Sequence, residues 1–227
     1  MEYEKIIEPR VNDTPFSLYG AQMLDFSVGG VGVKNGYLFT PSAFFPVVVS
    51  GEITLRRVKI TLDFSGFGWQ ETERAISDLT AVFLAGCDLL LPDGFYYRCA
   101  FDQNSAPKRP APWISTATFE FDGVRHGRLE QRTLTASGSF VVEGNRPAPA
   151  RLTVSGISGT VTVAGITITG LTGTVVIDGL SRKVTQNGSN VFGNTDLTTF
   201  PKLTPGRAEI VFTAGLTVKV EYYPLYM

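Results

Sequence analysis

Residues 175–224 read VVIDGLSRKVTQNGSNVFGNTDLTTFPKLTPGRAEIVFTAGLTVKVEYYP and carry the clearest structural signals of the chain. Asp-Gly at 178–179 and Asn-Gly at 187–188 each separate two β-prone runs, as hairpin turns with positive φ do. A Pro-Gly turn is predicted at 205–206. In residues 217–222 apolar and polar side chains alternate, which predicts a final strand with one face on a core.

The same alternation occurs upstream. Residues 53–64 place Val58, Ile60, Leu62 and Phe64 on one side, which predicts a half-buried strand. Residues 71–85 change period, with apolar side chains at i, i+3 and i+7 and Gly86 as a stop, so they predict a helix packed on a sheet. Further turns are predicted at 35–36, 92–94 and 122–123, where Asn-Gly, Pro-Asp-Gly and Asp-Gly occur.

Composition excludes several classes of protein. The 227 residues carry 20 basic and 21 acidic side chains, a formal net charge of -1, which argues against a protein that mainly grips nucleic acid or an anionic membrane. No apolar run is long enough to span a bilayer. The acidic start MEYEKIIEPR does not read as a signal peptide.

No pattern of catalytic or metal-binding residues stands out. The single histidine, His126, lies in VRHGRL and is interpreted as a solvated or hydrogen-bonded side chain rather than a general base. Asp178 is explained by its turn, and Asp196 by bonds to nearby backbone amides rather than by glycoside hydrolysis. Cys87 and Cys99 are interpreted as free buried thiols, with a disulfide as the alternative. We therefore expect no catalytic, cofactor-binding or metal-binding residues and no enzyme activity.

Aromatic residues make up 11% of the chain and crowd the region around the predicted helix. They fit either a core or a core together with a subunit interface. The members of this group are Phe64, Phe67, Trp69, Phe83, Phe95, Tyr96, Tyr97 and Phe101.

A change in amino-acid composition indicates a domain boundary. GNRPAPA at 144–150 precedes a part rich in Thr, Val, Ile and Gly, in which short strands are cut by glycines. We therefore expect a first domain over 1–142 and a second over 143–227. Both are expected to be β-sandwich-type, the first carrying the one helix.

The C-terminal residues resemble the end of the distal tail (Dit-like) proteins of long-tailed bacteriophages. The resemblance rests on IDG-x-x-K-V-T-x-NG-x-N-V-F, on DL-x-x-FP-x-L-x-PG, and on the closing I-x-F and V-x-V-x-Y-x-P. The residues that carry it are Ile177, Asp178, Gly179, Lys183, Val184, Asn187, Gly188, Phe192, Asp196, Leu197, Phe200, Pro201, Leu203, Pro205, Gly206, Ile210, Phe212, Val218, Val220, Tyr222 and Pro224.

The resemblance implies a tail-tip hub. Residues 1–142 would form a belt domain that assembles as a hexameric ring, and 143–227 a galectin-like sandwich that projects outward. The ring would join the tail tube to the baseplate or adsorption apparatus and leave a DNA channel. Implied partners are the tail tube protein, a tail-tip or tail-associated protein and a receptor-binding protein, without specific nucleic acid or membrane.

The implied location is the tail tip of the virion, after assembly in the host bacterial cytoplasm. The resemblance fits an infectious phage and a prophage equally. An alternative reading is a sandwich module that binds glycans or a host surface protein. No His and Arg cluster around a tryptophan is found for sugar binding, since Trp69 and Trp113 both precede the second domain.

Overall fold

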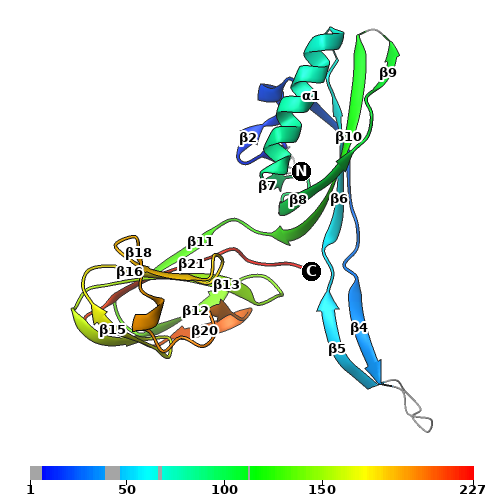
Figure 1. Ribbon diagram of the computed structural model, residues 1–227. Coiled ribbons are helices and arrows are strands. Elements are labelled where there is room, and N and C mark those ends of the chain that lie inside the picture. Colours follow the sequence, from blue (N-terminus) through cyan, green and yellow to red (C-terminus); the bar gives the residue numbers. More distant parts are fainter. Residues whose placement is uncertain (1–6, 39–46, 66–67, 112) are drawn as a thin grey trace, which may run out of the picture. The chain divides into compact units, whose positions relative to one another are not determined.

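The computed structural model describes residues 7–38, 47–65, 68–111 and 113–227 (Figure 1). The chain divides into two compact units, Met1–Arg125 (unit 1) and His126–Met227 (unit 2). Both are built from curled antiparallel sheets, so the predicted mainly-β class with one helix is confirmed for the described residues. The predicted boundary after residue 142 follows two strands, β11 (Glu130–Leu134) and β12 (Gly138–Val142), that pair with strands of unit 2.

Unit 1 contains an antiparallel sheet with the strand order β2-β1-β7-β8-β10-β6-β3, and β9 pairs with β10. A separate ribbon, β4 with β5, follows β3 and precedes β6. The elements are β1 (Arg10–Val11), β2 (Thr14–Pro15), the 3-10 helix η1 (Phe16–Tyr19), β3 (Gln22–Val28), β4 (Val33–Leu38), β5 (Val47–Ile53), β6 (Arg56–Asp63), α1 (Trp69–Leu84), β7 (Cys87–Leu90), β8 (Tyr96–Asn104), β9 (Lys108–Ala111) and β10 (Ile114–His126).

The helix α1 confirms the change of period read over 71–85. Ile76, Leu79 and Phe83 are buried against the sheet. At its start the backbone N–H of Gly68 donates to the Glu71 carboxylate at 3.1 Å, which satisfies one of the groups left free at a helix terminus. Gly86 ends the helix with φ +83°.

The alternation in β6 is also confirmed, because Val58, Ile60 and Leu62 are fully buried. The predicted turn at 122–123 is wrong. β10 runs straight through these residues, and a Cβ on Gly123 would lie 2.7 Å from the Cys99 Sγ. The glycine therefore permits close approach of β8 rather than a chain reversal.

The predicted turn at 35–36 is wrong as well. Asn35 and Gly36 lie inside β4, opposite Gly51 and Ser50 of β5. The register shifts directly after Gly36, so this glycine marks a bulge in the strand. The chain between β4 and β5 includes residues outside the described part.

Unit 2 is a β-sandwich. One layer has the order β11-β21-β13-β16-β17-β18, with β19 paired to β13, and the pairs β12–β20 and β14–β15 contribute to the same core. Its further elements are β13 (Ala148–Ser155), β14 (Gly159–Val163), β15 (Ile166–Leu171), β16 (Val175–Asp178), β17 (Lys183–Gln186), β18 (Ser189–Asn190), the 3-10 helix η2 (Phe192–Asn194), β19 (Lys202–Leu203), β20 (Gly206–Ile210) and β21 (Thr217–Tyr222).

The turns predicted at 178–179 and 187–188 are confirmed, while at 205–206 the chain bends at Pro205 and Gly206 begins β20 with φ of +99°. Asn187 and Gly188 connect β17 to β18 with φ of +50° and +84°, as a type I′ turn requires. Asp178 ends β16, and its Oδ1 accepts the backbone N–H groups of Leu180 and Ser181. In β21 Val218, Val220 and Tyr222 are buried, so its predicted core face is confirmed.

Candidate functional surfaces

His126 is buried rather than solvated. Its Nδ1 lies 2.8 Å from the backbone oxygen of Gly127, and its ring meets Tyr223 edge to face at 5.1 Å between centroids. The hydrogen-bonded interpretation of this histidine is confirmed.

The two aspartates also have local structural partners. Burial tends to raise the pKa of Asp178, but hydrogen bonds from Ser181 and Leu180 outweigh it and lower the pKa below its usual value. Asp196 Oδ1 accepts the Thr167 backbone N–H at 2.7 Å, and hydrogen bonds with Thr167 lower its pKa. Both carboxylates thus stabilise backbone groups, as the sequence predicted.

Cys87 and Cys99 lie opposite each other on β7 and β8 as free, buried thiols. Burial, and secondarily the charge of Asp88, raises the pKa of Cys87 to about 12. Burial also raises the pKa of Cys99, so neither thiol has the low pKa of a reactive cysteine.

Among the described residues, no group of His, Cys, Asp or Glu side chains is arranged to hold a metal ion. None of the described helices has the length and apolar character needed to cross a bilayer.

The face of the unit 1 sheet opposite α1 is polar and ion-paired. Arg57 of β6 donates to Glu120 at 2.7 Å, to Asp102 at 2.5 Å and to Asp122 at 3.4 Å. Lys59 adds a contact to Glu120 at 3.4 Å. We call Arg57, Lys59, Asp102, Glu120 and Asp122 the charge cluster; its cations already have carboxylate partners.

The charge cluster predicts a measurable pH effect. The Arg57 hydrogen bond, followed by that of Gln103, lowers the pKa of Glu120 to about 2. Because a lowered folded-state pKa stabilises the protein above the unfolded value, this contribution is lost as pH falls from about 4.5 to about 2. We expect Arg57→Gln to raise the Glu120 pKa, as followed by carboxyl NMR, and to flatten the pH dependence of stability in that window.

Arg57→Lys is the matched control for that experiment, because it keeps the positive charge but not the forked donor geometry. We expect an intermediate Glu120 titration for the lysine variant. An unchanged Glu120 titration curve in Arg57→Gln would contradict the assignment of Arg57 as the main cause.

Both tryptophans are exposed on unit 1. Trp69 opens α1 with 69% of its surface exposed, and Trp113 lies between β9 and β10 with 66% exposed. The Arg109 guanidinium stacks on the Trp69 ring at 3.7 Å and also pairs with Glu73 at 3.1 Å. Exposed tryptophans beside an ion-paired arginine are typical of protein interfaces.

For the aromatic residues around the helix, the sequence is compatible with a core alone and with a core together with a subunit interface. Phe64, Phe83 and Tyr97 lie in the core and Trp69 on the surface, whereas Phe67 falls outside the described residues.

The β4–β5 ribbon is a second exposed feature of unit 1. It continues away from the end of β3 and β6 as a sheet of two strands (Figure 1). Val33 and Ile53 at its base, and the neighbouring Leu55, are exposed. Isolated two-stranded ribbons are marginally stable in water, so a surface that covered this ribbon would stabilise it.

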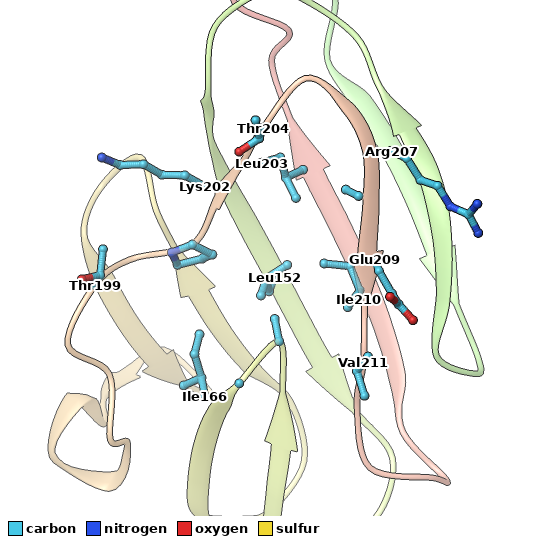
Figure 2. A pocket seen from close by; sticks show the side chains of 14 residues that line it. Leu152, Ile166, Thr199, Lys202, Leu203, Thr204, Arg207, Glu209, Ile210 and Val211 are labelled. Atoms are coloured by element: carbon cyan, nitrogen blue, oxygen red, sulfur yellow. The ribbon is translucent and has the colours of Figure 1, made fainter.

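Unit 2 contains a groove of about 540 Å3. One wall is β20 with Val211 and the other is the segment 199–204, and Leu152 and Ile166 lie between them (Figure 2). Figure 2 shows Lys202 on one wall and Arg207 and Glu209 on the other, with Leu152 and Ile210 in the middle. No sequence pattern predicted this groove, because its walls come from separate segments that the fold places together.

The fold matches known phage proteins. The Dit protein (gp 19.1) of phage SPP1, described as a hub of the adsorption apparatus in phages that infect Gram-positive bacteria, superposes with a TM-score of 0.72 at 12% identity, over 96% of this chain and 99% of that one. Two chains from the activated phage P2 baseplate, one structure with calcium and one with strontium, each match with a TM-score of 0.60 at 9% identity. They cover 92% and 95% of this chain, and 92% and 97% of their own.

A scan against family models and a search of curated proteins find no match. The structural neighbours nevertheless extend over nearly the whole length of both chains. This chain therefore has the two-unit fold of a Dit-like hub protein, and the resemblance read from its C-terminal residues is confirmed at the level of the fold.

Proposed function

We propose that this protein is a structural component of a phage or prophage tail tip. Copies of it form a hexameric ring that joins the tail tube to the baseplate or adsorption apparatus and leaves a channel for DNA. The observation that carries the proposal is the match to the SPP1 hub over 96% of the chain. At 12% identity that match supports the fold, and ring formation needs a test of its own.

The polar sheet face suits the wall of such a channel. Arg57 and Lys59 are engaged by the carboxylates of the charge cluster, so they offer little free positive charge to a passing phosphate backbone. Arg98 on β8 is likewise held by Asp88 at 2.6 Å. We therefore place this face toward the DNA and propose no specific nucleic-acid binding.

A closed ring needs two different surfaces on each copy that meet head to tail. Unit 1 offers two candidates. One is the tryptophan surface, which we define as Trp69, Arg109 and Trp113, and the other is the β4–β5 ribbon. Burial of either in a neighbouring copy would remove exposed apolar side chains from water.

The remaining parts of the proposal follow from the same role. The partners would be the tail tube protein, a tail-tip or tail-associated protein and a receptor-binding protein, and the location would be the virion tail tip. Unit 2 would be a galectin-like sandwich. The protein would act through assembly contacts, with no catalytic step.

Self-association of the purified chain tests the proposal. We expect light scattering to give a mass near six times 24.6 kDa. The double variant Trp69→Ser and Trp113→Ser should shift the protein toward the mass of one chain, because exposed tryptophans contribute about 2 kcal/mol or more each at interface centres.

Val141→Ser is the matched control, because Val141 is 69% exposed but lies in unit 2. We expect this variant to keep the mass of the parent. A parent protein with the mass of one chain at every concentration would contradict ring formation. A double variant that keeps the full assembly would remove the tryptophan surface from the proposed interface.

A further inference from the structure

The groove of unit 2 lies along an open strand edge. Among the strands of the described residues, β20 pairs with β12 alone, along one of its edges. On the other side, the Val211 carbonyl accepts the Ala164 N–H at 2.8 Å, and the Thr213 N–H donates to the Thr162 carbonyl at 2.9 Å. A short antiparallel contact with the end of β14 therefore begins along this edge.

That contact stops at the turn after β14. Ala164 and Gly165 have φ of +48° and +78°, so the chain reverses there into β15. Successive residues of a strand direct their backbone groups to opposite edges. Arg207 and Glu209 thus direct their N–H and C=O groups to the same edge as Val211, where no strand of the described part of the chain pairs with β20. The groove occupies this position.

The side chains around the open edge are suited to an extended peptide. Leu152 and Ile210 form an apolar floor, while five successive residues from Arg207 to Val211 line one wall. Five consecutive strand residues can line one groove only if it runs along the strand edge, because their side chains alternate between faces. The shape favours a chain with alternating apolar and polar residues over a compact ligand.

The charged side chains around the groove indicate the charge of the peptide that would bind. Lys202 is exposed on the wall opposite β20, and Arg207 donates from Nε to Ser139 at 3.2 Å. Within the part of the chain that the structure describes, neither cation forms an ion pair with a carboxylate. An acidic side chain on the incoming strand would pair with Lys202, on the wall opposite Glu209.

We propose that this groove accepts one extended, acidic strand from another protein, which pairs with the open edge of β20 and extends the line begun by β14. Backbone hydrogen bonds to Arg207 and Glu209 would hold the strand, apolar side chains would rest on Leu152 and Ile210, and a carboxylate would face Lys202. The groove lies within unit 2, so its failure as a strand site would leave the ring proposal for unit 1 untouched.

Amide NMR of the full chain with a synthetic probe tests this proposal. The probe is acetyl-Thr-Val-Glu-Val-Thr-Val-amide at about 1 mM, a concentration that detects weak binding. We expect shifts of the Lys202, Arg207 and Glu209 amides. Lys202→Glu should weaken binding about fivefold, and a probe with Lys in place of Glu should recover it. Lys183→Glu, an exposed lysine on β17, is the control and should leave binding unchanged.

Backbone methylation of the probe separates strand pairing from simple charge attraction. N-methyl groups on the alternate residues that face β20 should abolish the shifts, and N-methyl groups on the intervening residues should be tolerated. Equal loss with both methylated probes, or no shift at Arg207 and Glu209 at about 1 mM probe, overturns the proposal. Shifts at these amides that depend on protein concentration without any probe assign the groove to a second copy and overturn it as well.

Discussion

Truncation of Phe83 to alanine is expected to lower the free energy of unfolding of unit 1 by about 3–5 kcal/mol. Phe83 is fully buried on α1. Its ring meets Phe119 and Phe121 of β10 edge to face, at 5.1 and 4.9 Å between centroids, and Phe101 of β8 at 6.2 Å. One side chain therefore joins the helix to two strands, and its removal leaves a cavity that rigid strands fill poorly.

Tryptophan fluorescence during urea unfolding measures this effect in unit 1 alone, because both tryptophans of the chain lie there. The neighbouring Leu84→Ala is the control. Leu84 is 70% exposed, so its truncation should change the free energy of unfolding by less than about 0.5 kcal/mol. Equal effects of the two variants would contradict the packing of α1 described above.

Gly179→Ala is expected to destabilise unit 2 by about 3 kcal/mol. A Cβ at this position would lie 2.7 Å from the carbonyl oxygens of both Ala150 and Pro201. The Gly179 N–H also donates to Ala150 at 2.9 Å, so the residue is fixed between β13 and the segment before β19. The new methyl group meets backbone atoms, which move only if the strand pairing changes.

Gly193→Ala is the matched control, since an added Cβ there meets no atom within 4 Å. Far-UV circular dichroism reports the unfolding of both units, and tryptophan fluorescence reports unit 1 alone. We expect the loss of stability to appear in the circular dichroism and not in the tryptophan fluorescence, which assigns it to unit 2. A Gly179→Ala protein as stable as Gly193→Ala would show that the contact can relax at little cost, contrary to this account.

Local sequence predicted elements well where neighbouring residues alone determine them. The helix over 71–85 could be predicted because its apolar residues and the Gly86 that ends it are close together in the sequence. The structure places this helix at Trp69–Leu84. The Asn-Gly pair at 187–188 forms the predicted turn, whereas the same pair at 35–36 lies inside β4. The dipeptide permits a turn, but distant strand pairing decides whether it forms one.

The functional surfaces could not be predicted in the same way. Arg57 meets carboxylates that are 45, 63 and 65 residues away in the chain, so its role depends on strand order. The open edge of β20 exists because β14 turns away at Ala164. Exposure of Trp69 likewise follows from its place at the end of α1, since an aromatic residue in sequence is compatible with core and surface alike.

The central claim is that copies of this chain close into a ring around an open channel, and electron microscopy of the purified assemblies tests it most directly. The account predicts class averages that show rings with six-fold symmetry and an empty centre, formed by the chain alone. Isolated single copies, or compact particles without a central opening, would contradict it.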